Sequence, residues 1–388
     1  MTKLTRQGRA AGDARPPRAA FPALAAASLA LLGAGGPADE ALAQRGSEDR
    51  EAGVELHWWP VRESVWMLVG AGANVTASVG PDGVFLVNAG QEQAGERVLT
   101  AIEDLQSQLR SFGELDVEVP ERGGAETRSR FPVNTHAPPK PIRYIVNTSS
   151  LPHNVGGNEL LAASGVTYSG GNVAGTIADA SVGAAVLAHE NVLVRLVSSG
   201  APFEALPTET FFDDEYKLST FFNGEGIRIV HIPAATTDGD SIVYFRGSDV
   251  IATGDVFNMD TFPIIDVERG GHIDGVIEAL NYILRLAIPE FRTEGGTMIV
   301  PGRGRLADSA DVGYYRDMLT IIRDQVQALI DRGMTLEQVI AERPTFGYEG
   351  RFGSETEPWT TEMFIEAVYR SLREQRVTGG SSTLGGRG

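Results

Sequence analysis

Residues 142–158 read IRYIVNTSSLPHNVGGN and form the most informative stretch of the chain. The first five of them are a short, mainly apolar β-run, which is typical of a buried strand. A polar loop follows, which holds His153 and ends at Gly157, and residues 158–163 favour a short helix. Because substrates usually meet a sheet at loops that leave its strands, this loop is a candidate functional segment.

Four other loops have the same design, in which Gly and polar residues follow a β-run. They lie far apart in the sequence, yet each is placed where its strand ends. If the strands share an edge, the loops meet there. These loops are residues 87–90 (VNAG), 235–240 (ATTDGD), 253–255 (TGD) and 301–304 (PGRG).

The whole chain alternates β-runs with helical stripes, in two similar halves that each open with β-runs and close with helices. This order predicts an α+β fold in which two sheets pack face to face with helices outside. The predicted strands are residues 54–59, 65–69, 74–79, 84–87, 142–146, 184–187, 227–232, 242–245, 250–253 and 298–300. One predicted helix follows Gly90. The other predicted helices cover residues 158–163, 190–196, 273–286, 312–330, 336–341 and 361–372.

The composition excludes several classes of protein. The 388 residues include no Cys, and 33 Lys and Arg stand against 51 Asp and Glu, which gives a net charge of −18. An acidic chain without a basic cluster repels nucleic acid. A chain without Cys has no disulfide scaffold, thiolate metal site or Cys nucleophile, so any metal needs His, Asp or Glu.

The N-terminus has the pattern of a secretion signal. Five basic residues precede the apolar stretch 19–35, which is too short for a comfortable membrane span, and Ala41-Leu42-Ala43 fits a cleavage site. We therefore expect a signal peptide at 1–43 and a periplasmic or secreted protein with no membrane segment after cleavage. The further boundaries that we predict are a linker at 44–52, a domain at 53–376 with a surface insertion at 113–140 and a C-terminal helical extension at 308–376, and a flexible tail at 377–388.

Several short sequence segments, and the order in which they occur along the chain, resemble the metallo-β-lactamase-fold superfamily, and specifically its exported bacterial zinc-hydrolase-like branch. The resemblance runs from about Leu56 to Leu372 and implies an αββα four-layer sandwich with the active site at one edge between the sheets. Its phrases are residues 72–76 (GANVT), 188–193 (AHENVL), 238–243 (DGDSIV) and 359–364 (WTTEMF).

Most of the zinc ligands that this family uses are replaced here. Ser149 and Leu151 stand at the positions of the first two His of the family's His-x-His-x-Asp-His loop, His153 at its Asp and Asn154 at its last His. Thr236 and Arg303 stand at two later His positions. Of the family's ligand set, the resemblance keeps only Asp255, the carboxylate that bridges the metals.

These replacements predict that zinc does not bind and that zinc-dependent hydrolysis is lost. Leu151 has no donor atom, hydroxyls and amides are poor zinc ligands, and Arg303 stays positively charged. Without zinc, no ion lowers the pKa of a bound water. We expect a pseudoenzyme or small-molecule binder in which Arg303 pairs with Asp255.

Alternative interpretations remain open. The first alternative is an active hydrolase of β-lactams, thioesters or lactones with an atypical site. This site could be a partial metal site of His153 and Asp255 with Asp238 or Asp240. It could also be a Ser149–His153–Asp255 triad, although the sequence has no Gly-x-Ser-x-Gly elbow. A structural or interaction protein could use its outer helices. The sequence specifies neither a ligand nor an oligomeric state. The remaining histidines are predicted to be structural or exposed: His57, His136, His189, His231 and His272.

Overall fold

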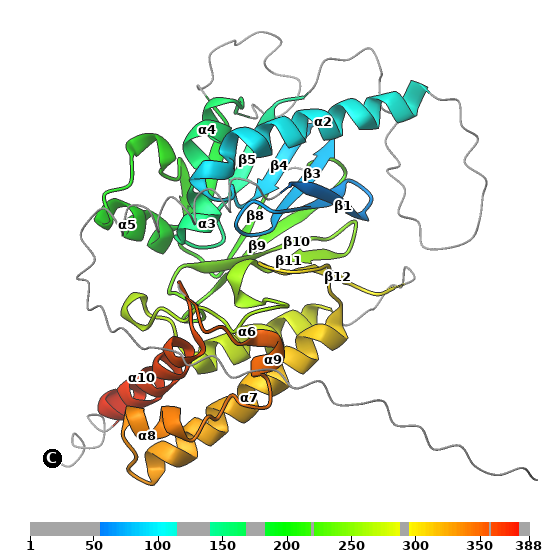
Figure 1. Cartoon of the computed structure of the whole chain (residues 1–388). Helices are drawn as coiled ribbons and strands as arrows, with labels where there is room; N and C mark the ends of the chain where they lie inside the picture. The colour runs from blue at the N-terminus through cyan, green and yellow to red at the C-terminus, as the bar shows by residue number, and fades with distance from the viewer. Residues whose placement is uncertain are drawn as a thin grey trace, which may run out of the picture. The chain divides into compact units, whose positions relative to one another are not determined.

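Two β-sheets lie face to face, and helices cover their outer faces (Figure 1). This computed structural model describes residues 55–114, 140–167, 183–218, 221–287, 295–356 and 358–379. The predicted signal peptide, the linker, most of the surface insertion, His136 and most of the tail lie outside these residues.

The first sheet has seven strands in chain order. Strands β1 to β4 are antiparallel, and β5 to β7 then add in parallel. Parallel neighbours need crossover connections, and α4 and α5 lie in the chain on either side of β6. The strands are β1 (His57–Arg62), β2 (Val65–Val69), β3 (Val75–Gly80), β4 (Gly83–Val87), β5 (Ile142–Val146), β6 (Ala185–His189) and β7 (Glu209–Phe211).

The second sheet has five strands in the order β12-β11-β10-β9-β8. Only the β11–β12 pair is parallel within it. Its strands are β8 (Glu215–Lys217), β9 (Ile227–Ile232), β10 (Asp240–Phe245), β11 (Val250–Ala252) and β12 (Met298–Val300).

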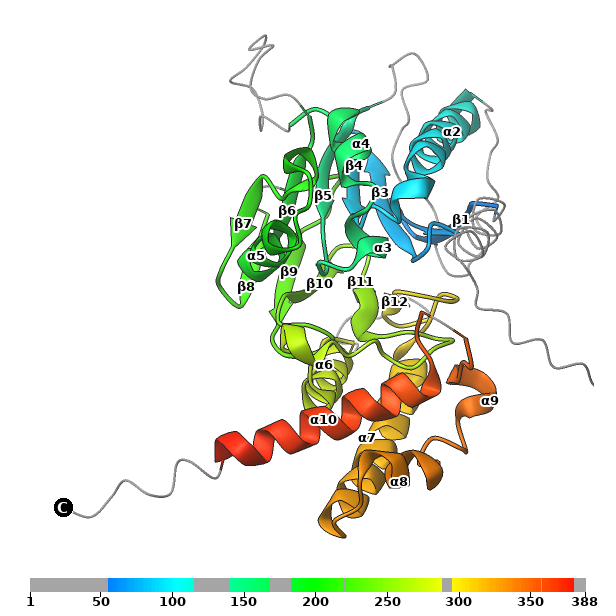
Figure 2. The same ribbon diagram turned by 60° about the vertical axis from the view of Figure 1, so that its left-hand side comes forward.

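Helices form the two outer layers. On the first sheet lie α2 (Gly95–Glu114), α4 (Asn158–Ala163) and α5 (Glu190–Ser198), with the single turn α3 (Pro152–Val155) at the sheet edge. On the second sheet lie α6 (Ile273–Leu286), α7 (Ser309–Asp331), α8 (Leu336–Ala341), α9 (Glu349–Phe352) and α10 (Thr361–Gly379), which Figure 2 shows on the side away from the first sheet. Short 3₁₀ turns are η1 (Glu92–Ala94), η2 (Phe203–Ala205), η3 (Gly254–Val256) and η4 (Val267–Arg269).

Three large apolar clusters hold the four layers together. The cluster between the sheets includes Phe85 and Phe245, whose rings meet edge to face with centroids 5.8 Å apart. Each large apolar side chain buried in this way contributes about 1.5–3 kcal/mol. A second cluster joins the first sheet to α2 and α4, and a third joins the second sheet to α6, α7 and α10. The predicted αββα sandwich is therefore confirmed.

Most predicted elements match closely. Strands β2, β5, β9 and β12 and helices α4, α6 and α8 have the predicted bounds. One face of α7 packs in the core, because its apolar residues are all buried: Tyr315, Met318, Ile322, Val326 and Ile330. The sequence did not indicate the three- and four-residue elements α3, α9, β7 and β8, which are too short to show a period. Within the described ranges, no helix has both the length and the apolarity of a membrane span.

Candidate functional site

The predicted loops meet at one edge of the two sheets. The Asn88 side chain, just after β4, accepts hydrogen bonds from the backbone and hydroxyl of Thr148, at 2.9 and 3.0 Å. Thr148 in turn accepts from Ser241 N of the second sheet, at 2.8 Å. A Cβ at Gly254 would lie only 2.3 Å from Thr148 Oγ1, so only glycine lets the β11 loop approach this closely. The shared edge is thus formed by chain segments that are distant in sequence.

Asp255 is the centre of a buried hydrogen-bond network. Its Oδ1 lies 2.8 Å from His153 Nε2, and its Oδ2 accepts from Asn154 Nδ2 at 2.5 Å. Both donors come from α3, the short turn that follows β5, while Asp255 itself lies in η3 after β11. The carboxylate is only 2% exposed. Both of its oxygens are therefore bound by side chains of the chain itself.

The electrostatic setting of Asp255 favours its charged form. Burial by itself raises the pKa of a carboxyl. The charge and hydrogen bond of His153, the charge of Arg303 and the hydrogen bond from Asn154 outweigh burial and lower the pKa of Asp255 below its ordinary value. Asp255 is therefore an anion at neutral pH, stabilised by neighbours rather than by solvent.

Ser149 does not form a catalytic triad with His153. Its buried hydroxyl accepts hydrogen bonds from Asn154 Nδ2, at 2.8 Å, and from Leu151 N, at 3.2 Å. No bond joins Ser149 to His153 among the described residues. Because a triad needs the nucleophile within hydrogen-bond reach of its base, this alternative lacks its geometric basis.

Thr236 belongs to a second buried network, which is centred on Asp240. The Asp240 carboxylate accepts from Thr236 N and Oγ1, at 2.5 and 2.8 Å, and from Thr237 N, at 2.8 Å. Burial raises the pKa of Asp240 to about 7, because every nearby donor is neutral and Asp255 adds a like charge. This carboxyl closes the loop between β9 and β10, which is a usual role of an Asp side chain in a turn.

Asp238 and Asp240 are both engaged away from His153. Asp238 forms a paired salt bridge with Arg195 of α5, with distances of 2.6 and 3.3 Å, and Asp240 binds the threonines of its own loop. Neither carboxylate therefore completes the partial metal site that His153 and Asp255 would begin.

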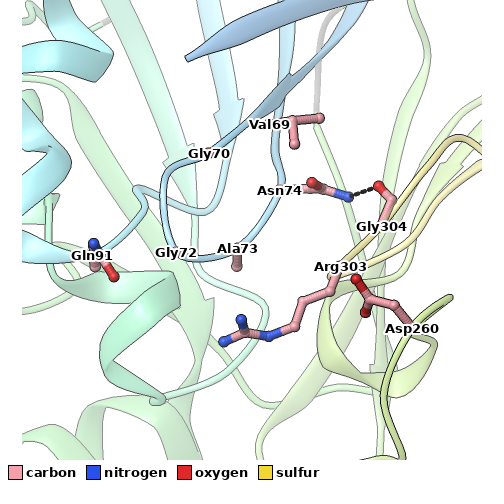
Figure 3. A pocket seen from close by; sticks show the side chains of 9 residues that line it. All are labelled: Val69, Gly70, Gly72, Ala73, Asn74, Gln91, Asp260, Arg303 and Gly304. Atoms are coloured by element: carbon pink, nitrogen blue, oxygen red, sulfur yellow. Dashed lines mark hydrogen bonds between the residues drawn. The ribbon is translucent and has the colours of Figure 1, made fainter. Parts of the chain in front are cut away.

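Arg303 does not pair with Asp255, so this prediction was wrong. Among the described residues, the Arg303 side chain has no hydrogen bond and no ion pair, and it acts on Asp255 only through its charge. The physical reason is that His153 and Asn154 already occupy both oxygens of Asp255. Arg303 instead extends into a cavity of about 250 Å³ (Figure 3). The cavity is lined by Val69, Gly70, Gly72, Ala73, Asn74, Gln91, Asp260, Arg303 and Gly304.

Sequence reasoning missed three polar residues of this cavity. Gln91 follows the early Gly90 loop, Asp260 follows η3, and Asn74 lies just before β3. The Asn74 amide donates to Pro301 O and Gly304 O, both at 2.9 Å, which joins the loop before β3 to the Arg303 loop. Asn74 stood in one of the phrases that carried the family resemblance, but nothing in the sequence showed that it faces Arg303.

These residues do not fit a zinc ion. Zinc needs three or four neutral imidazole or anionic donors that converge on one point. Within the described ranges, no group of three or more His, Asp or Glu side chains is placed to hold a metal. At the family's ligand positions, the Ser149 and Thr236 hydroxyls are bound within the chain, Leu151 has no donor, and Arg303 brings a permanent positive charge.

The other described histidines have structural roles. His189 and His272 cap α5 and α6, because their Nδ1 atoms accept from Asn191 N and Asp274 N at 3.3 and 3.0 Å. His231 stacks on His189 with ring centroids 3.6 Å apart. These contacts confirm the predicted structural role of all three, while His57 lies on the outer strand β1.

The chain matches no known family model and no functionally curated protein. Solved structures do match. A double mutant of the sec-alkylsulfatase PisA1 of Pseudomonas sp. is 14% identical, with a TM-score of 0.50 over 86% of this chain, which spans about half (52%) of that protein. The metallo-β-lactamase from Pontibacter korlensis is 13% identical (TM-score 0.43, 69% of this chain and 99% of that one), and DIM-1 metallo-β-lactamase is 14% identical (TM-score 0.43, 69% and 97%). With its four layers, the chain has the metallo-β-lactamase fold.

Proposed function

We propose that this protein of the metallo-β-lactamase fold binds a small molecule at the described edge and does not carry out zinc-dependent hydrolysis. One observation carries the proposal. Asp255, the carboxylate that bridges the metals in the family it resembles, has both oxygens bound by His153 and Asn154. The Arg303 guanidinium lies in the adjacent cavity, where it opposes any second cation.

The energetics support this proposal. A zinc ion would have to break two hydrogen bonds to a buried charge, each worth about 1.5–3 kcal/mol. It would gain few ligands in return, since Ser149, Leu151, Thr236 and Arg303 supply none that zinc prefers. Without the ion, the zinc-bound hydroxide that attacks substrates in this family has no source.

The test compares the natural chain with a variant in which the ligands are restored: Ser149→His, Leu151→His, His153→Asp, Asn154→His, Thr236→His and Arg303→His. Both are assayed on β-lactam, thioester and lactone panels, with added zinc and with a chelator. We expect no zinc-dependent turnover by the natural chain. Calorimetric zinc binding that appears only in the restored variant supports the proposal, whereas zinc-dependent turnover by the natural chain contradicts it.

One observation favours a second function, hydrolysis without metal. The Asp255 carboxylate orients the imidazole of His153, and His153 Nδ1 has no hydrogen-bond partner among the described residues. A carboxylate-oriented imidazole can act as a general base toward water. Turnover that persists in chelator and disappears in His153→Gln, but not in His57→Gln, would establish this function in place of pure binding.

We also propose that the protein is exported to the periplasm or beyond. The support is the basic and apolar N-terminal pattern, which lies outside the described residues. N-terminal sequencing of the protein from a bacterial periplasmic fraction should find a chain that begins near Gln44. Recovery of an intact Met1 from the cytoplasm would contradict export.

A further inference from the structure

The Arg303 guanidinium is a cation without a protein partner among the described residues, and its backbone is held in place. The carbonyl of Arg303 accepts from Met259 N at 3.1 Å, and the Asn74 amide holds the residues on either side of it, Pro301 and Gly304. The backbone is thus held by three hydrogen bonds, whereas the half-buried side chain has no partner among the described residues. A planar guanidinium presents five donors in a fork that matches a carboxylate.

A second unused donor lies in the same cavity. Gln91 packs so closely over Gly72 that a Cβ at Gly72 would lie 2.4 Å from Gln91 Oε1. The side-chain amide of Gln91 has no hydrogen bond within the described part of the chain. Figure 3 shows the guanidinium of Arg303 extending past Ala73 toward the Gln91 side of the cavity. A cation and an amide donor therefore line one pocket without protein acceptors.

The size and walls of the cavity restrict the ligand. A volume of about 250 Å³ corresponds to roughly eight waters in the liquid, which suits a small organic molecule. Val69 and Ala73 place apolar side chains beside the polar groups, and Gly70 and Gly72 add no side chain of their own. Sites that combine apolar walls with a few directed polar groups are typical of small-ligand pockets.

The charges around the cavity select against multiply charged anions. The exposed carboxylate of Asp260 lines the same cavity, and the charged Asp255 lies close enough to interact with Arg303. The protein as a whole carries −18. Near these two carboxylates a dianion meets twice the repulsion that a monoanion meets, and the cavity lining offers it no second cation.

We propose that this cavity binds the carboxylate of a small organic monoanion, with Arg303 donating two parallel hydrogen bonds and Gln91 a third. The inference rests on the proposed zinc-free binding function, because it gives Arg303 the space and charge that a metal would occupy. It also names the ligand class, monocarboxylates in preference to phosphates, sulfates or dicarboxylates.

The test uses benzoate, its neutral isostere benzamide, and the dianion phenylphosphonate, titrated calorimetrically into the full chain at pH 8. We expect benzoate to bind with a Kd on the order of 1 mM or below, and benzamide and phenylphosphonate to bind at least tenfold more weakly. Arg303→Gln should weaken benzoate binding roughly tenfold to a hundredfold, since charge-assisted hydrogen bonds are lost. Asp260→Asn should reduce the difference in Kd between benzoate and phenylphosphonate.

The matched control is Arg305→Gln, two residues further on. Arg305 is exposed and already bound to Asp311, at 2.8 and 3.0 Å, so its loss should leave benzoate binding unchanged. No benzoate binding, or equal binding in Arg303→Gln and the natural chain, would overturn the inference while leaving zinc-free function intact. Tight zinc binding by the natural chain would instead overturn the proposed function itself.

Discussion

Asp240 and Asp255 are two carboxyls in one region, almost equally buried at 1% and 2% exposure, yet their acidities move in opposite directions. Asp240 receives only neutral donors from Thr236 and Thr237, so burial dominates and raises its pKa to about 7. Asp255 is just as buried, but His153, Arg303 and Asn154 lower its pKa. The difference shows that hydrogen-bonding and charged neighbours, rather than depth, determine which of the two carboxyls stays charged.

The comparison also shows how side chains of the protein satisfy both buried carboxyls. The family it resembles uses dications to neutralise carboxylates at this edge. Here His153 and Asn154 bind the oxygens of Asp255 and the charge of Arg303 acts on it, while Asp240 is satisfied by its own loop. Single substitutions at Asp255, Asp240, His153 and Arg303 test this comparison.

The largest effect is expected from Asp255→Ala. The change leaves the Asn154 amide without an acceptor and leaves His153 and Arg303 without an anion. Removal of one partner from a buried charged network destabilises by about 3 kcal/mol or more. Urea unfolding at pH 7 measures the loss. Asp260→Ala, which removes an exposed carboxylate from the neighbouring cavity, should change the free energy of unfolding by less than about 0.5 kcal/mol. Equal losses of unfolding free energy in the two variants would show that the buried Asp255 network does not stabilise the fold.

Asp240→Asn should alter how stability depends on pH. The folded pKa of Asp240, about 7, lies above the ordinary 3.8, so its favourable contribution is full below pH 4 and is lost as pH rises through 7. Between pH 5 and pH 7.5 the natural chain should therefore lose roughly 2 kcal/mol relative to the variant. Denaturant unfolding at both pH values measures this difference. Parallel curves for the two proteins would mean that Asp240 does not titrate near neutrality.

His153→Gln should make the protein more sensitive to acid. Because the folded pKa of Asp255 is lowered, its stabilisation is present above its unfolded pKa and is lost only as pH falls through the folded value. Without His153, burial dominates, the pKa of Asp255 rises, and acid unfolding begins at higher pH, with about 1.5 kcal/mol lost at pH 7. Acid titration followed by circular dichroism tests this, with the exposed His57→Gln as control. An unchanged midpoint pH of acid unfolding would show that His153 does not lower the pKa of Asp255.

The smallest stability effect is expected from Arg303→Gln. Its side chain has no protein partner among the described residues, so the free energy of unfolding should change by less than about 0.5 kcal/mol. Arg228→Gln is the matched contrast, because Arg228 forms two 2.7 Å bonds with Glu215 and should cost about 1 kcal/mol. A larger loss for Arg303 than for Arg228 would indicate the ion pair with Asp255 that the sequence suggested.

Most of the fold was predictable because its elements are long and periodic. The stripes of α2 and α7 and the apolar runs of β5 and β9 carry their own signal, and the order of the loops carried the family resemblance. The elements that could not be predicted from the sequence include α3, a single helical turn, and β7, a short edge strand. Both depend on contacts with neighbouring elements. Their formation follows from tertiary contacts rather than from local propensity.

The site was predictable as a set of residues but not as a set of contacts. The sequence indicated that His153, Asn154, Asp255 and Arg303 lie at one edge, but it predicted the wrong partner for Asp255. Charge alone favoured Arg303, whereas geometry favours the donors of α3, which lie directly over the carboxylate. Gln91 and Asp260 went unnoticed, since a lone amide and a loop carboxylate carry no pattern until the fold places them in a cavity.

Whether this edge holds a metal is decided by elemental analysis of zinc in the natural chain, purified without chelator and then dialysed against micromolar zinc. We expect far less than one zinc per chain, because the hydrogen-bonded Asp255 and the positive Arg303 leave no complete ligand set. One or two equivalents that resist removal by a weak chelator would contradict it.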